Sequence, residues 1–436
     1  MQNVRERSIS IGVLLLLLFL IALNSSITVF SVDQFGIFWA PFALFILSLI
    51  VPCWLLYISK LNVQISEDEV GMNFRKRYFF VGAGLALMLL LVPDIYRAFE
   101  SNSLPTKNSD VLQQMNHLFD RFVAGEQPYT NVTSILWKPF PVYMPLHWIP
   151  LGIGKLLHID VRWGGYIIFV LIYIYAIWSI SKKAKLGVGE FLLLIIVPFA
   201  YFNFTLSYCV DNIHTVFEII ILGYYLLLAL GLYLQKHKII ILALICIMLS
   251  RYTVVFFLPL LMYVLYVRFG LKTLKKYVLW GGSAFVLLYV IPFLVREPSI
   301  LQDGLAYHNK FAVSEYQRLL DGKLPSILND GSSFMLIARK WWQIDDPLAG
   351  INVIRLFQLI MSAILTVFLI IFYHINRSKI NVFDFLLASM GMYLIFFYCT
   401  APFAYGYYWM GFHSYLWIVS LRILQVYKQR YLYQIN

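Results

Sequence analysis

A carboxylate opens the most polar long stretch of this chain, residues 108–129, which reads NSDVLQQMNHLFDRFVAGEQPY. Asp110 can cap a helix there, and a carboxylate held rigidly at a helix start can also act as a general base. His117 falls on the polar face of that helix, and Gly125 can end it. The apolar residues recur at the spacing of one helix face, which predicts an amphipathic helix on a membrane surface: Val111, Met115, Leu118 and Phe122.

Arg251 is the strongest candidate for binding an anion. It stands between two apolar runs, in IIILALICIMLSRYTVVFFLPLLMYVLY, with no acidic residue beside it. An arginine at such a depth needs a partner, and its planar guanidinium binds phosphate in a bidentate manner. The sequence leaves two kinds of partner open: a phosphate, or a buried ion pair with Asp211 or Glu218.

Other carboxylates lie where apolar runs end. Asp94 closes the third run, so it is a second candidate for a general base, or a plain anchor at the membrane interface. Asp211 and His214 stand where the fifth run emerges. Ionisable residues there suggest function, although a short polar loop explains them equally well.

The second half of the chain adds weaker candidates. His308 and Lys310 lie among aromatic residues in a long polar segment. Tyr408, in APFAYGYYWMGFHSY, can stack on a sugar ring or belong to an aromatic belt at the interface, and the belt is the favoured interpretation. The acidic pair in IDDP, at 344–347, suggests a metal site only weakly, because a helix or turn start explains it.

Composition decides what kind of elements position these residues. The chain is 61% hydrophobic and only 13% charged, which is about half the charged fraction of a soluble domain. Apolar runs of about 18 residues or more, each able to cross a bilayer, recur along it. We therefore expect an all-α polytopic membrane protein. The net charge of +12 fits cytoplasmic loops, and nucleic acid is not an expected partner.

Positive charge sets the expected orientation. Segments rich in Lys and Arg alternate with short ones that carry neither, at 31–36, 207–213 and 399–410. This pattern places both termini in the cytoplasm and predicts about twelve spans. We expect them near 9–30, 37–58, 78–93, 164–181, 188–206, 214–234, 239–250, 253–267, 278–295, 354–373, 380–398 and 411–426.

Two long segments remain outside, 94–163 and 296–353. Prolines make a smooth transmembrane helix unfavourable at the start of the Trp-rich stretch that follows residue 136, so we expect 140–157 to lie on the surface or to re-enter the membrane. The chain then divides into three parts: two N-terminal helices with their loop (1–77), a core (78–270) and C-terminal helices (271–436).

From about residue 78 to 270 the order of features resembles the GT-C glycosyltransferases, and most closely the polyprenol-phosphate-mannose-type mannosyltransferases. A membrane-surface Asp precedes a helix, then G125-E-Q-P-Y129, then the Pro-aromatic segment PVYMPLHW and a small hydrophobic helix. That family reads roughly Asp, a helix-length spacer, Gly-x-x-x-Tyr, then Tyr-Pro-Pro. This chain has Val-Tyr-Met-Pro at the last position and two helices before the one that resembles the family's first.

The resemblance implies transfer of a mannose-like sugar from a polyprenyl phosphate to a hydroxyl of a glycan, lipid or protein, at the outer face of the plasma membrane. Asp110 would be the general base, with Asp94 as the alternative, and Arg251 would contact the donor phosphate. No metal ligand is implied, and a divalent cation stays open as a cofactor. The expected substrate contacts are Asp211, His214, His117, Tyr129, His308, Lys310 and Tyr408.

Two other classes remain open. A glycan polymerase or ligase that uses lipid-pyrophosphate oligosaccharides also has many spans and a polar outer loop, but that loop usually comes late in the chain. A secondary transporter fits the number of spans, but it needs a site near the membrane midplane, whereas the polar residues here gather at the outer face.

Overall fold

The computed structural model describes residues 2–60, 72–101, 110–321, 333–334, 341–402 and 405–433. Within these ranges the regular elements are all helical, so the expected all-α membrane fold is confirmed. The number of about twelve spans stays a prediction. Eight described segments are long and apolar enough to cross a membrane: Ser10–Phe30, Trp39–Ser59, Phe74–Ser101, Trp163–Lys183, Val188–Tyr208, Leu258–Leu294, Pro347–Asn376 and Val382–Thr400.

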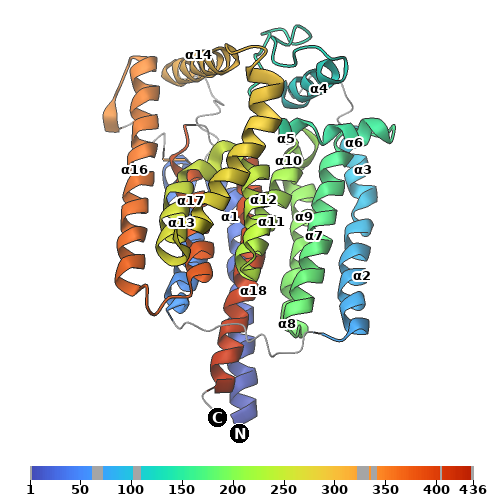
Figure 1. Ribbon diagram of the computed structural model, residues 1–436, viewed down its shortest axis with the longest axis vertical. Helices are drawn as coiled ribbons and strands as arrows, with labels where there is room; N and C mark the ends of the chain where they lie inside the picture. The colour runs from blue at the N-terminus through green and yellow to red at the C-terminus, as the bar shows by residue number, and fades with distance from the viewer. Residues whose placement is uncertain are drawn as a thin grey trace.

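Three helices lie across one end of the upright bundle, as Figure 1 shows: α4 (Asp110–Val123), α6 (Leu151–Leu156) and α14 (Ile300–Leu320). We call this end the capped end. The start of α1 (Gln2–Ser59) and the end of α18 (Met410–Tyr433) lie at the opposite end (Figure 1). The capped end therefore contains helices from both of the long segments that the charge pattern assigns to the outside.

The centre of the bundle is α11 (Ile219–Leu234), all 16 residues of which are buried. It packs against α7 (Trp163–Lys183), α12 (His237–Met248) and α18. Burial on every side of an apolar helix is typical of the middle of a bundle. The outer helix α16 (Pro347–Asn376) instead exposes a row of large apolar side chains to the surroundings: Leu356, Leu359, Ile360, Ile364, Val367, Phe368 and Ile371.

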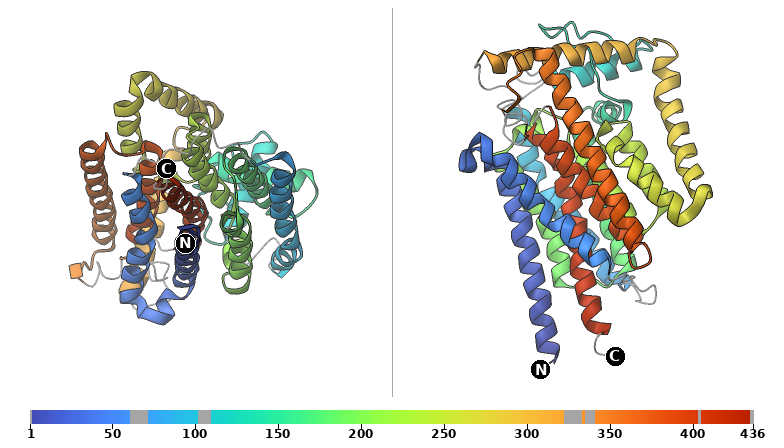
Figure 2. Two further views of the ribbon diagram at one scale, coloured as in Figure 1. Left: turned by 90° about the horizontal axis from the view of Figure 1, so that it is seen from below. Right: turned by 90° about the vertical axis from the view of Figure 1, so that its left-hand side faces the viewer.

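Two glycines with positive φ break long helices into legs. Gly36 (φ 70°) divides α1, and Gly270 (φ 76°) divides α13 (Leu258–Phe285). Glycine reaches such a φ without steric cost. Figure 2 shows the chain leaving the capped end along the first leg of α13 and returning to it through η3 (Val286–Leu294). These legs match the spans expected near 253–267 and 278–295, and apart from Gly270 the connection between them is helical.

The remaining helices complete the bundle. Neither α5 (Pro145–Trp148) nor α6, with 4 and 6 residues, can cross a bilayer, as expected for the segment 140–157. The others are α2 (Phe74–Leu90), α3 (Val92–Ser101), α8 (Val188–Phe191), η1 (Leu192–Ile196), α9 (Val197–Tyr208), α10 (Asp211–His214), η2 (Tyr252–Phe256), α17 (Val382–Thr400) and η5 (Gly406–Trp409).

A buried ion pair joins the last two long helices. Asp384 of α17 accepts two hydrogen bonds from Arg422 of α18, Nε to Oδ1 and Nη2 to Oδ2, both at 2.7 Å. Both side chains are almost wholly buried. A bidentate pair of this kind fixes the relative rotation and height of the two helices.

A close contact docks the surface helix α14 on α16. The ring of Tyr316 lies directly over Gly350, where a Cβ atom would be 2.3 Å from the Tyr316 Cζ. The Tyr316 hydroxyl donates a hydrogen bond to the carbonyl of Ile344 at 2.9 Å. Ala312, Tyr316, Ile351 and Ile354 form a small hydrophobic core between the two helices. This contact holds α14 in place across the capped end.

Candidate functional site

Asp110 is the first residue of α4 at the capped end. The Gln114 side chain donates a hydrogen bond to its Oδ2 at 3.1 Å. Burial raises the pKa of the Asp110 carboxyl above its ordinary value, and hydrogen bonds from Gln114 and Trp137 partly offset that effect. A carboxylate with a raised pKa is a stronger base than an exposed one, so Asp110 suits proton abstraction.

Four tyrosines lie within electrostatic reach of Asp110 or of Arg251. We call Tyr143, Tyr405, Tyr407 and Tyr408 the tyrosine cluster. The ring centroids of the last three lie 4.9 to 5.3 Å apart. Burial raises the pKa of Tyr143 well above its usual value, and the negative charge of Asp110 raises it further. Asp110 also contributes to the raised pKa of Tyr405. The carboxylate therefore lies within electrostatic reach of this cluster.

Arg251, which lies between α12 and η2, is close to three of the same tyrosines. Its guanidinium carbon lies 6.0 Å from the ring centroid of Tyr143, 5.7 Å from that of Tyr407 and 5.0 Å from that of Tyr408. At these distances a guanidinium is attracted to the electron-rich faces of the rings. Asp110 and Arg251, 141 positions apart, thus both act on Tyr143.

The partner of Arg251 in the structure is Glu218, immediately before α11. Of the partners that the sequence left open, the ion pair with Glu218 is therefore present, and Asp211 is not involved. The His147 Nε2 lies 3.7 Å from Glu218 Oε1. Arg251 Nε is buried and makes no hydrogen bond within the described residues. The ion pair balances the charge of Arg251 but leaves one of its donors available.

The short helices around this ion pair hold it below the surface of the bundle. With 16 and 12 residues, α11 and α12 are about 24 Å and about 18 Å long, less than the roughly 30 Å of a bilayer core. The segment around α5 covers their ends: Leu146 N–H donates to the carbonyl of Leu249 at 2.8 Å, and Tyr224 donates to the carbonyl of Leu146 at 3.1 Å.

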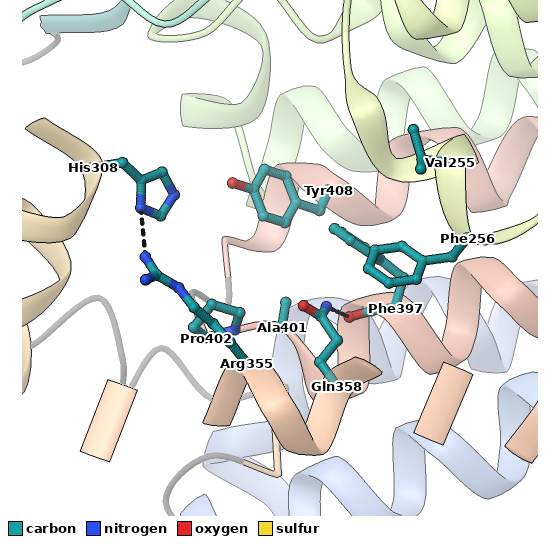
Figure 3. A pocket seen from close by; sticks show the side chains of 9 residues that line it. All are labelled: Val255, Phe256, His308, Arg355, Gln358, Phe397, Ala401, Pro402 and Tyr408. Carbon is teal, nitrogen blue, oxygen red and sulfur yellow. Dashed lines mark hydrogen bonds between the residues drawn. The ribbon is translucent and has the colours of Figure 1, made fainter. Parts of the chain in front are cut away.

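A cavity of about 280 Å³ adjoins the tyrosine cluster, and Tyr408 belongs to both. Figure 3 shows the side chains around it, which come from η2, α14, α16, α17 with the two residues that follow it, and η5. One part of its wall is polar and the other is apolar. The lining residues are Val255, Phe256, His308, Arg355, Gln358, Phe397, Ala401, Pro402 and Tyr408.

The polar part of this wall contains an arginine that the sequence analysis did not single out. Arg355 Nη1 donates to Asn309 Oδ1 at 2.6 Å, and its Nη2 donates to His308 Nδ1 at 3.1 Å. His308, a predicted substrate contact, lines the same cavity. A charged residue within an otherwise apolar helix could have indicated Arg355, but it lies at the outer end of that helix, where interface anchors are common.

Asp94, Asp211 and His214 lie elsewhere. Asp94 is exposed on α3 and pairs with Arg97 one helical turn on. Asp211 is 82% exposed and accepts a hydrogen bond from His214 Nε2 at 2.8 Å. The His214 carbonyl accepts a hydrogen bond from Arg162 at 2.7 Å. No contact with the tyrosine cluster is seen for these three side chains in the described part of the chain.

Three other expected residues surround the site without lining its cavity. His117 makes a 3.0 Å hydrogen bond to Thr130 Oγ1. Tyr129 is buried, and its hydroxyl donates to the carbonyl of Tyr143 at 2.9 Å, which helps to position the cluster. Lys310 is exposed on α14.

The acidic pair in IDDP begins a helix, as the non-metal interpretation predicted. Asp346 caps α16 by accepting hydrogen bonds from the backbone N–H groups of Leu348 and Ala349. Among the residues that the structure describes, no three His, Cys, Asp or Glu side chains are grouped as a metal site requires.

Comparison with protein-family models, with curated proteins and with solved structures finds no match for this chain. Its own geometry therefore carries the functional argument: in the part of the chain that the structure describes, a helical membrane bundle has a half-buried carboxylate and an arginine near an aromatic cluster at its capped end.

Proposed function

We propose that this protein is a membrane glycosyltransferase of the GT-C type, which transfers a mannose-like sugar from a polyprenyl phosphate to an acceptor hydroxyl. The observation that supports this most is that the Asp110 carboxylate and the Arg251 guanidinium both lie within electrostatic reach of Tyr143, whose ring centroid is 6.0 Å from that guanidinium. Such a transfer requires a base for the acceptor proton and positive charge near the donor phosphate. Both groups adjoin aromatic rings that can stack against a sugar.

In the proposed reaction the acceptor oxygen forms a bond to the anomeric carbon of the sugar. The bond between that carbon and the phosphate oxygen breaks, and its electron pair leaves with the polyprenyl phosphate. Asp110 takes the hydroxyl proton. Arg251, whose guanidinium carbon lies 5.0 Å from the ring centroid of Tyr408, offsets the charge that develops on the phosphate. Asp94 is the weaker candidate for the base, because it is exposed and already paired with Arg97.

The capped end faces the outside of the plasma membrane in this proposal. The acceptor, a glycan, a lipid or a protein, then approaches from water, and the donor approaches from lipid. Basic residues at the opposite end support the orientation, among them Lys182 and Lys183, which close α7, since cytoplasmic segments are enriched in Lys and Arg.

The test is sugar transfer by the purified protein in lipid nanodiscs, with a panel of polyprenyl-phosphate sugars as donors. Replacing Asp110 by Asn should lower the transfer rate by about 10²- to 10⁴-fold, the usual contribution of a general base. Asp303→Asn removes an exposed carboxylate from α14 at the same end and serves as the matched control, with an unchanged rate.

Asp94→Asn decides between the two carboxylates. A large loss in that variant, with full activity in Asp110→Asn, would transfer the role of base to Asp94. If the wild-type protein neither binds nor turns over any donor of the panel, the glycosyltransferase proposal is wrong.

A further inference from the structure

Three basic side chains lie where long apolar helices end or turn, at the end of the bundle opposite the capped end. Lys60 directly follows the membrane-length second leg of α1, and Arg377 directly follows α16. Arg268 lies two residues before Gly270, where α13 turns back. All three side chains are exposed. They therefore lie where apolar helices leave the hydrocarbon core, which is the level of lipid phosphates.

These positions are remote in the sequence but close in the fold. The Lys60 Nζ lies 4.7 Å from the centroid of the Phe372 ring. The charges of Arg268 and Arg377 both act on the hydroxyl of the next residue, Tyr373. The right-hand view of Figure 2 shows the bend of α13 next to the end of α16, and the two helices are in contact. We call Lys60, Arg268 and Arg377 the basic cluster.

Polar contacts fix the elements that carry the basic cluster. The Asn381 N–H donates to the carbonyl of Ser59 at 2.9 Å, which places the end of α1 beside the turn that follows α16. The Tyr263 hydroxyl and His374 Nδ1 lie 3.4 Å apart and join the first leg of α13 to α16. The three charges are therefore held in one arrangement by the packing of three helices.

The charge of the basic cluster is not balanced by acidic side chains in the described ranges. Two carboxylates near the same end already have basic partners, since Glu190 pairs with Lys428 and Asp384 pairs with Arg422. Three positive charges around two neighbouring rings repel one another. An anion placed between the two guanidiniums removes this repulsion and accepts charge-assisted hydrogen bonds from both.

The surface beside the basic cluster is apolar or aromatic. Ile371 and Ile375 on α16, Leu271 on α13 and Tyr57 on α1 all expose their side chains. Tyrosine one helical turn before a basic residue is typical of a membrane interface. A soluble anion makes no use of such neighbours. A phospholipid that presents its phosphate to the cluster places its acyl chains along these side chains, so the surroundings favour a lipid.

We propose that the basic cluster binds the headgroup of an anionic phospholipid, with the phosphate between Arg268 and Arg377 and with Lys60 beside it. In the orientation proposed above, this lipid belongs to the cytoplasmic leaflet. The site lies at the opposite end from Asp110 and Arg251, so neither its existence nor its test depends on sugar transfer.

The test titrates the full-length protein, in an uncharged detergent, with fluorescently labelled phosphatidylglycerol. Each basic residue near a lipid headgroup contributes about fivefold in affinity, so Arg268→Gln with Arg377→Gln should weaken binding by about 25-fold. Lys182→Gln with Lys185→Gln removes two exposed basic residues from the same end and should leave binding unchanged. Equal binding by the two double variants would overturn the proposal.

A charge-preserving variant separates recognition from folding. Arg268→Lys with Arg377→Lys keeps both positive charges and should retain most of the binding. If it loses as much affinity as the glutamine variant, positive charge is not what the lipid recognises, and the proposal fails.

Two competitors establish the class of ligand. Phosphatidylcholine with the same acyl chains has no net charge, and inorganic phosphate has no chains, so each should compete poorly. Effective competition by phosphatidylcholine would show that the chains alone suffice. Effective competition by inorganic phosphate would show a site for a soluble anion. Either result would overturn the proposal.

The chain itself supplies a rival occupant. Glu67, Asp68 and Glu69 follow Lys60 in the sequence, in the range 61–71, which lies outside the described residues. If these carboxylates filled the basic cluster, labelled phosphatidylglycerol would bind only after Glu67→Gln, Asp68→Asn and Glu69→Gln together. Binding that appears only in this triple variant would assign the cluster to the chain's own acidic segment.

Discussion

Burial makes the Asp110 carboxylate a stronger base, and it also means that ionisation of this group lowers the stability of the folded protein. Burial raises its pKa, so the folded protein holds this proton more tightly than an unfolded chain does. A raised pKa means that the contribution to stability is fully present at low pH and is lost as the pH rises through the folded-state pKa. Catalysis needs the opposite, ionised form, so the transfer rate should fall as the pH drops through that same raised pKa.

The hydrogen bond from Gln114 affects the pH at which the transfer rate falls, that is, the acid limb of the pH–rate profile. It stabilises the carboxylate and so lowers the pKa of Asp110. Gln114→Leu removes it, and the acid limb of the pH–rate profile should move upward by about 0.4 to 1 pH unit, from a bond of roughly 0.5–1.5 kcal/mol.

Gln317→Leu is the matched control for this shift. Gln317, exposed on α14, donates to Asp321 at 2.9 Å, so it also bonds a carboxylate four positions away, although towards the C-terminus. Its loss should leave the profile in place. A profile that Gln114→Leu does not move would show that Asp110 is not the titrating base.

At the scale of elements, the site depends on how surface helices are held on the bundle. The sequence predicted α4 well, because its apolar spacing and its terminal glycine are local signals. Gly125 has φ 75°, and Glu126 N–H donates to the carbonyl of Arg121 at 2.9 Å, a typical helix end. The docking of α14 on α16 could not be predicted in this way. Tyr316 and Gly350 are far apart in the sequence, and no residue spacing indicates that the ring lies over the glycine.

Adding one methyl group at Gly350 should loosen that docking. Gly350→Ala places a Cβ atom against the Tyr316 ring, so the ring and α14 must shift. We expect faster hydrogen–deuterium exchange across 300–320 and weaker donor binding. Gly281→Ala, where no atom lies within 4 Å, should cause neither change. Equal exchange in the two variants would mean that α14 is held by other contacts.

The Asp384–Arg422 pair should matter for stability rather than for chemistry, because it lies away from the tyrosine cluster on α17 and α18. Asp384→Asn leaves a buried arginine without its counter-charge, which typically costs about 3–5 kcal/mol. Thermal unfolding in detergent should show a clearly lower midpoint. The double variant Asp384→Leu with Arg422→Met, which removes both charges, should be milder, and a double variant as unstable as the single one would contradict this explanation.

For the whole molecule, the sequence predicted an all-α membrane protein in which Lys and Arg gather at one end. Both features follow from composition along the chain. It did not predict the cavity. Tyr143, Arg251, Arg355 and Tyr408 meet only through the packing of helices that are remote in sequence, and periodicity within one helix contains no information about such a meeting. The number of spans also depends on short helices such as α12, which length alone does not classify.

Accessibility to a membrane-impermeant thiol reagent checks the orientation. In a background without the four native cysteines, Ser314→Cys on α14 should react from outside intact cells. Ser378→Cys, exposed after α16 at the other end, should react only after permeabilisation. Reaction of both from the same side would contradict the expected topology.

The packing of α1 has a consequence for the order in which the protein is made. α1 packs on α17 and α18, and Trp54 donates to the hydroxyl of Tyr427 at 3.0 Å, so α1 is synthesised well before the helices on which it packs. At about 5–20 residues per second the wait is tens of seconds. Ser48 meanwhile donates to Asn24 Oδ1 at 2.8 Å, across the two legs of α1. The N-terminal hairpin thus satisfies its own polar side chains and can remain in lipid until the C-terminal helices arrive.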